Sequence, residues 1–176
     1  KNSSCRYTTI QNWAPNVLNL VTKRALIEEN GTMEWIDGNI GSKVTMKYPA
    51  CILKGDNSTG TCITISVATK EQQQDSGARM IHIGKNTKSS IISKSIARNG
   101  GDASYRGKVD IKEGATGSEA MVKCDTLILD KDSKSNAYPT NICRNTSSSL
   151  EHEATVSKVS EEKLFYLMSR GIPREK

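Results

Sequence analysis

Short apolar segments separated by polar turns fill most of the chain. In Thr61–Thr69, TCITISVAT, the side chains of Ile63, Ile65 and Val67 fall on one face at the two-residue period of a β-strand. Similar strand-like segments occupy Lys43–Leu53, Met80–Ala97 and Met121–Asp130. The segments between them, such as KGDNSTG and ARNGGDAS, are rich in turn-forming residues. The pattern predicts a mainly β protein.

The apolar segments recur at intervals of roughly twenty residues, the spacing of a solenoid in which every coil adds short strands to a continuous stack. An antiparallel sandwich with as many strands would show the same alternation. Hydrophobic residues make up 35% of the chain and aromatic residues 5%, which is little for a thick core. This composition favours the solenoid.

The two ends of the chain differ from its middle. Asn16–Glu29 admits a helix or a strand, because its apolar residues fit a helical stripe but include β-branched types. Ser160–Gly171, SEEKLFYLMSRG, predicts a helix, because it begins with a capping serine and two glutamates and ends with a glycine. We expect a β-helix core domain over residues 1–158 and the start of a C-terminal helical domain over 159–176.

Composition and charge limit the classes of partner and the cellular locations that we expect. The net charge is +6, but lysine and arginine are spread along the chain without a basic run, so we expect no nucleic-acid partner. No apolar segment is long enough to span a membrane and no signal peptide is present. The five cysteines are odd in number and form no CxxC pair, which argues against a disulfide framework and a closed zinc site. A cytoplasmic location is expected.

Cys124 is the first candidate for chemistry. It lies between Lys123 and Asp125, and a neighbouring lysine can lower the pKa of a thiol and favour the thiolate. The alternative is a buried core cysteine, because Cys124 has the same strand parity as Val122 and Ile128. Both interpretations stay open at this point.

Three other residues of interest have structural interpretations. Cys51 and Cys62 lie inside apolar segments, so core positions are expected for both. His82, in MIHIGKN, has the opposite parity to the isoleucines on either side and is interpreted as a structural or surface histidine.

The sequence Glu151-His152-Glu153 is the second candidate for chemistry. In an extended strand, Glu151 and Glu153 would share one face and His152 would lie on the other, so a flat strand cannot direct all three at one metal ion. A solvated strand edge is the plain alternative. Carboxylate and imidazole together with a thiolate suit iron or zinc.

Seven motifs run in order along nearly the whole chain, and the fourth and the last are the most specific. They are QNW (Gln11–Trp13), LVTKRA (Leu20–Ala25), KYPACILKGDNS (Lys47–Ser58), MIHIGKNTKSSIISKSI (Met80–Ile96), SYRG (Ser104–Gly107), CDTLILD (Cys124–Asp130) and SLEHEATVSKVSEEKLFYLMSRGI (Ser149–Ile172). Together they resemble the SufB family, the core scaffold subunits of the SUF system for iron–sulfur cluster assembly.

The resemblance implies a right-handed parallel β-helix, with Asn16–Glu29 mostly strand and loop. It implies a SufD-like paralogue and a SufC-like ATPase as partners, with the ATPase docked on the C-terminal helices and nascent clusters formed at the interface with the SufD-like subunit. A homodimer through the exposed end of the β-helix is left open.

The resemblance also implies the site. The cysteine of the family's CD(S/T)L motif falls on Cys124, and its LEHEAT motif falls on Glu151, His152 and Glu153. Cys124 and Glu153 are the predicted metal ligands of a transient iron–sulfur cluster, with Glu151 and His152 in support. A soft thiolate and a hard, labile carboxylate would hold a cluster more loosely than four cysteines.

Two other functions remain as alternatives to a scaffold that is not itself an enzyme. A β-helix hydrolase or lyase could use Glu151 and Glu153 on a polysaccharide, but one Phe and two Trp offer little surface for stacking sugars. A purely structural interaction module would leave all five cysteines inert.

Overall fold

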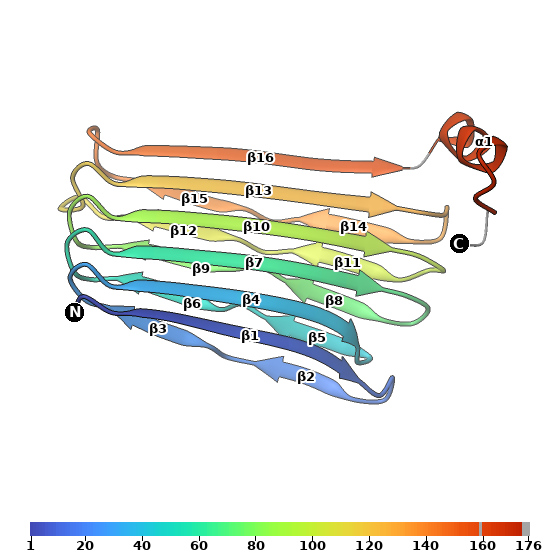
Figure 1. Ribbon diagram of the computed structural model, residues 1–176, viewed down its shortest axis with the longest axis horizontal. Helices are drawn as coiled ribbons and strands as arrows, with labels where there is room; N and C mark the ends of the chain where they lie inside the picture. The colour runs from blue at the N-terminus through green and yellow to red at the C-terminus, as the bar shows by residue number, and fades with distance from the viewer. Residues whose placement is uncertain (159, 174–176) are drawn as a thin grey trace.

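Each coil of the chain contains one long and two short strands, and equivalent strands of successive coils pair in parallel. The computed structural model describes residues 1–158 and 160–173. The long strands have ten residues each and form sheet A (Figure 1), in the order β1 (Ser4–Trp13), β4 (Thr32–Gly41), β7 (Thr59–Ala68), β10 (Lys88–Ala97), β13 (Glu119–Ile128) and β16 (Ser149–Lys158).

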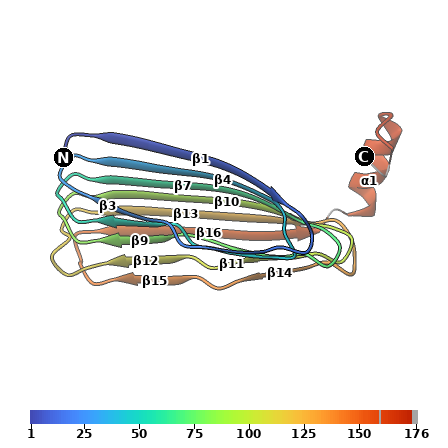
Figure 2. The ribbon, with the colours of Figure 1, turned by 90° about the horizontal axis from the view of Figure 1, so that it is seen from below.

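The short strands have four residues each and form two further parallel sheets. Sheet B contains β2 (Leu18–Val21), β5 (Val44–Lys47), β8 (Gln73–Ser76), β11 (Asp102–Tyr105) and β14 (Lys134–Ala137). Sheet C contains β3 (Arg24–Ile27), β6 (Ala50–Leu53), β9 (Arg79–His82), β12 (Lys108–Ile111) and β15 (Thr140–Cys143). Figure 2 shows sheet A as one layer of a flattened solenoid and sheets B and C as the layer that returns beneath it.

This architecture confirms the predicted parallel β-helix and excludes the antiparallel sandwich. Asn16–Glu29 contains β2 and β3, as the strand-and-loop interpretation predicts. The predicted repeat of roughly twenty residues is wrong, because the long strands begin 27 to 31 residues apart. Each coil must accommodate a ten-residue strand, two four-residue strands and three connections.

A residue in the left-handed backbone conformation lies two positions before each of β4, β7, β10 and β13. Asn30, Asn57 and Asn86 have φ angles of 53°, 57° and 54°, and Gly117 takes the same place with φ 65°. Asparagine and glycine adopt this conformation at least cost. The backbone N–H groups of the three asparagines donate to carbonyl oxygens of the next coil, so these turns link the coils as the strands do.

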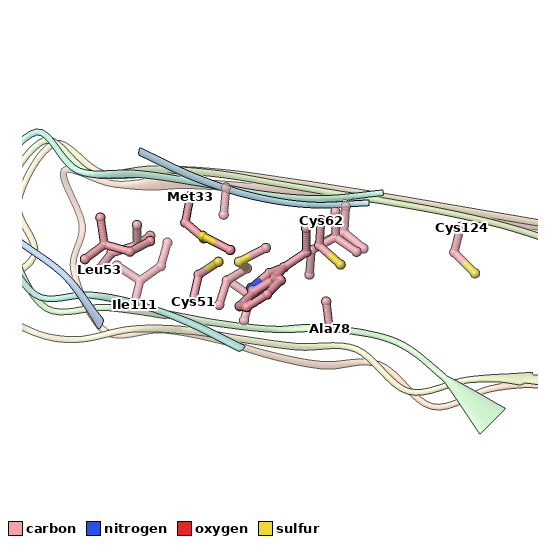
Figure 3. Packing of buried hydrophobic residues seen from close by; sticks show 14 of the residues in the cluster. Met33, Cys51, Leu53, Cys62, Ala78, Ile111 and Cys124 are labelled. Atoms are coloured by element: carbon pink, nitrogen blue, oxygen red, sulfur yellow. The ribbon is translucent and has the colours of Figure 1, made fainter. Parts of the chain in front are cut away.

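The interior between the two layers is apolar at one end and polar at the other. Its apolar cluster includes Met33, Cys51, Leu53, Cys62 and Ile111, which Figure 3 shows between sheet A and the returning layer. Towards the C-terminal ends of the long strands, the buried side chains are mainly polar. They include Asp37, Asn39, Thr45, Lys47, Ser66, Gln74 and Ser76.

Strand β7 shows which side chains of sheet A point into the interior of the solenoid. Ile63, Ile65 and Val67 share one face as predicted, but this face is the outer one, where Ile65 is 55% exposed. The inner face carries Gly60, Cys62, Thr64, Ser66 and Ala68. Layers that approach closely leave room for small side chains, so the bulky β-branched residues stack outside.

The predicted C-terminal helix is confirmed as α1 (Glu161–Ser169). The hydroxyl of Ser160 accepts a hydrogen bond of 3.3 Å from the backbone N–H of Lys163, and Gly171 follows the helix with φ 82°. These are the capping and ending roles expected of both residues. Residues 159 and 174–176 of the predicted helical domain lie outside the described residues, so the division into two domains stays a prediction.

Candidate functional site

The candidate residues lie on β13 and β16, the last two strands of sheet A in the described chain. The strands pair in parallel with Lys123 opposite Glu153 and Cys124 opposite Ala154. The predicted site residues therefore lie on two adjacent strands, although 27 residues separate Cys124 from Glu151 in the sequence. Within the part of the chain that the structure describes, β16 is one of the two terminal strands of the sheet, and β1 is the other.

Cys124 is only 3% exposed. Figure 3 shows its side chain on the inner side of sheet A, set apart from the other labelled residues of the apolar cluster. Burial, together with the charge of Asp125, raises the pKa of its thiol to about 11. Of the two interpretations left open by the sequence, the geometry favours the buried core cysteine over activation by Lys123, because Lys123 points to the outer face, where its Nζ lies 3.3 Å from Glu153 Oε2. The protonated thiol is therefore the resting form of Cys124 at neutral pH.

The three residues of the β16 motif divide between the two faces of the sheet. Glu151 and Glu153 take the outer face and His152 the inner one, as the alternation of a strand predicts. All three are exposed. Cys124 and Glu153 are therefore close along the sheet but lie on opposite faces of it, and the structure does not bring their side chains together.

Cys124 and His152 share the inner face instead. His152 is the register partner of Val122, two residues before Cys124 on the neighbouring strand. Strand geometry puts their Cα atoms roughly 8 Å apart. At this end of sheet A, the inner face thus carries the Cys124 thiol and the His152 imidazole, and the outer face carries the carboxylates of Glu151 and Glu153.

No group of three or more histidine, cysteine, aspartate or glutamate side chains in residues 1–158 and 160–173 is placed to hold a metal ion. A cluster bound at this edge would need ligands from another chain, a movement of β16, or both. The assignment of Cys124 and Glu153 as ligands stays a prediction.

A shallow pocket of about 370 Å³ lies beside Glu151 on the outer face of sheet A. Its lining is polar or small apart from one methionine, and includes Thr59, Thr61, Lys88, Ser90, Glu119 and Met121. No aromatic ring lines it, so it offers a sugar nothing to stack on. This composition gives the carbohydrate-enzyme alternative no support.

The remaining buried cysteines and the second histidine have the structural roles that the sequence predicts. Cys51 and Cys62 are fully buried, and burial raises the pKa of both thiols to about 12. His82 is also fully buried, with its ring nitrogens 2.7 Å from Thr87 Oγ1 and 2.8 Å from Ser89 Oγ. Burial lowers the pKa of His82 to about 4, so the ring is neutral.

Sequence reasoning missed a buried ionic cluster around Asp37. The Nζ atoms of Lys23 and Lys47 both lie 2.8 Å from its Oδ1. Burial alone would raise the pKa of Asp37, but hydrogen bonds from the two lysines outweigh it and lower the pKa. Asp37 and Cys124 occupy the same register column of sheet A, three coils apart. An alignment of the coils at their true spacing would therefore have shown that Asp37 faces the interior.

Comparison with known proteins identifies the family. Residues 1–176 match the family described as "SUF system FeS cluster assembly, SufBD core domain". The chain is 61% identical over 175 residues to the iron-sulfur cluster assembly protein SufB of Bacillus subtilis (strain 168), covering 99% of this chain and 38% of that protein. An iron-sulfur cluster assembly SufBD family protein of Staphylococcus epidermidis is 58% identical with the same coverage.

The chain thus spans about 38% of the length of these relatives. No helix in its described part is long and apolar enough to cross a membrane. The parallel β-solenoid, the ordered motifs and the match over all 176 residues agree. The chain belongs to the SufB/SufD family of iron–sulfur cluster assembly proteins.

Proposed function

We propose that this chain is the β-helix part of a scaffold on which iron–sulfur clusters are built de novo and held transiently. The family membership supports an assembly role. The observation that carries the site is that all four predicted residues lie on β13 and β16, at one end of sheet A. An end strand is where a second subunit can complete a site that one chain leaves incomplete.

The partners follow from the same proposal. A SufD-like paralogue meets the scaffold at the cluster site and supplies the missing ligands, and a SufC-like ATPase hydrolyses ATP to drive rearrangement. The scaffold itself is then not an enzyme, and it works in the cytoplasm without nucleic acid or membrane. A homodimer through the same edge is the competing assembly.

Metal binding must overcome the burial of Cys124. Iron binds the thiolate, so it must displace a proton from a thiol whose pKa is about 11. Separation of β16 from β13 would expose the sulfur and allow His152 or Glu153 to approach it. In this proposal Cys124 supplies the soft ligand, Glu153 the labile one, and Glu151 and His152 secondary contacts.

The scaffold function is tested by cluster transfer. The complete protein, purified with its SufC-like and SufD-like partners, is reconstituted anaerobically with iron and sulfide and mixed with an acceptor protein that lacks its cluster. A scaffold passes the cluster on, so the acceptor gains its visible absorption and its activity. A reconstituted complex that keeps its cluster in the presence of the acceptor contradicts the proposal.

The role of Glu153 is tested against a matched carboxylate. Glu119→Gln is the control, because Glu119 also lies on the outer face of sheet A and forms a similar exposed ion pair, 3.1 Å from Lys88. Glu153→Gln should lower the cluster content of the reconstituted complex, while Glu119→Gln leaves it unchanged. If only His152→Gln lowers the content, the ligand partner of Cys124 is the inner-face imidazole.

A further inference from the structure

A second polar hollow lies far along the coil from sheet A, at the corner where sheet B passes into sheet C. Tyr48, Gly77, Arg106 and Tyr138 occupy the same corner position in four successive coils. Each directly follows a sheet B strand, and backbone hydrogen bonds continue the strand ladder across them. The four residues therefore stack along the solenoid axis at the spacing of neighbouring strands.

Gly77 creates a gap in this stack. A Cβ at Gly77 would lie 1.7 Å from the carbonyl oxygen of Arg106, so no other residue fits there. Tyr48 and Arg106 are thus separated by a position without a side chain. A pocket of about 320 Å³ lies at this corner and is lined by Tyr48, Arg79, Arg106, Gly107, Lys108, Tyr138 and Thr140.

Three cationic side chains line the pocket, and strand pairing places two of them opposite each other. Arg79 and Lys108 are direct register partners on β9 and β12. Like charges opposite each other in a sheet repel and destabilise it. Among the described residues, neither has a carboxylate within ion-pair distance, and Arg106 has only Asp75, at 2.6 Å from its Nε. The pocket carries three positive charges against one negative charge.

Arg106 is held in place before any ligand arrives. Asp75 accepts a hydrogen bond from its Nε, and its guanidinium lies 4.3 Å from the centre of the Tyr138 ring. On the other side of the gap, the guanidinium of Arg79 lies 5.8 Å from the centre of the Tyr48 ring. A guanidinium fixed by a carboxylate and an aromatic face loses little freedom on binding an anion.

We propose that this corner pocket binds a phosphate-class oxyanion. Two guanidinium groups and an ammonium offer the several charge-assisted donors that such an anion accepts. The bound anion would also relieve the repulsion between Arg79 and Lys108. The pocket belongs to sheets B and C, away from β13 and β16, so the inference does not rest on the proposed scaffold function.

The test uses the complete protein purified without its ATPase partner, so that the nucleotide site of the ATPase does not contribute to the binding signal. Inorganic pyrophosphate is titrated calorimetrically at constant ionic strength into the wild type, the double variant Arg79→Gln/Lys108→Gln and the control Lys88→Gln, an exposed lysine on sheet A. We expect saturable binding that weakens about tenfold or more in the double variant and stays unchanged in the control.

Thermal unfolding provides a second readout. Without pyrophosphate, the double variant should melt at the same temperature as the wild type or higher, because the repulsion is gone. With pyrophosphate, only the wild type and the control should gain stability. Equal binding by the double variant, or no saturable binding to the wild type at millimolar concentration, overturns the proposal.

A parallel titration with adenosine diphosphate identifies the source of the phosphate. Tighter binding than pyrophosphate, lost in the double variant, assigns the pocket to a phosphate carried by a nucleotide. Binding no tighter than pyrophosphate assigns it to a free anion.

Discussion

At the scale of single residues, position on the inner or outer face of a strand decides what each polar group can do. His82 and His152 are the two histidines of the chain. His82 is sealed in the interior with both nitrogens hydrogen-bonded, while His152 lies exposed on the terminal strand. The first stabilises the fold and the second remains available for a ligand.

Burial of His82 predicts a loss of stability in acid. The pKa of His82 is about 4 in the folded chain, against an ordinary value of 6.5 for a solvated histidine in the unfolded chain. Between these values the unfolded chain binds a proton that the folded chain does not. The contribution of His82 to the free energy of unfolding is fully present above pH 6.5 and is lost as the pH falls towards 4. The contribution of this one group is about 3 kcal/mol.

The measurement is the free energy of unfolding from urea titrations of the complete protein between about pH 4 and 7.5, a range that spans both pKa values. His82→Gln should flatten the acid limb of the profile, and His152→Gln should leave it as in the wild type. An acid limb that His82→Gln does not change would show that other groups cause it.

The buried ion cluster predicts a second effect at this scale. Asp37→Asn leaves Lys47, which is 1% exposed, without its carboxylate partner, and should lower the free energy of unfolding by about 3–5 kcal/mol. Adding Lys47→Met removes the buried charge and should recover part of this loss. Glu119→Gln, in an exposed pair, should cost less than about 1 kcal/mol. A double variant no more stable than Asp37→Asn would contradict this account.

At the scale of elements, strand periodicity was predictable and strand orientation was not. Alternation correctly divides Glu151 and Glu153 from His152. It also groups Ile63, Ile65 and Val67, but it cannot show that this apolar face points outwards. That depends on the distance between the layers, which no single strand encodes.

Replacement by alanine should affect stability very differently at two glycines of the coil turns. Gly77→Ala places a methyl group against the Arg106 carbonyl and should lower the free energy of unfolding by about 3 kcal/mol. Gly114→Ala is the control, because an added Cβ there meets nothing within 4 Å, and it should change stability by less than about 0.5 kcal/mol. Thermal unfolding of the two variants makes the comparison. Equal stabilities would show that the corner can relax.

At the scale of the whole molecule, the solenoid was predictable from the sequence. The candidate residues were taken from the family resemblance and stay a prediction, and their contacts were not predictable. Lys123 pairs with Glu153 and does not act on Cys124. This pairing depends on the register of β13 against β16. Register is set by the length of the intervening coil, and the apparent repeat in the sequence is too short to reveal it.

At the same scale, the proposed scaffold function gives the edge of sheet A at β16 a role. Successive coils cover each other's backbone, but the outer edge of β16 has no further strand of sheet A beside it in the described chain. In the proposed scaffold, ligands from the two faces of sheet A meet around this edge. A partner that completed the site there could release the cluster as the subunits move.

The proposed scaffold function depends above all on Cys124 as the anchor of the cluster, and a comparison of two cysteine variants tests this role. Cys124→Ala and Cys62→Ala remove buried thiols from the inner face of sheet A, at 3% and 0% exposure, so their packing costs are comparable. Each complete protein is assembled with its partners and reconstituted anaerobically with iron and sulfide, and the visible absorbance is recorded. If Cys124 anchors the cluster, the chromophore is lost in Cys124→Ala and kept in Cys62→Ala. A chromophore of equal intensity in both variants would contradict it and place the cluster elsewhere.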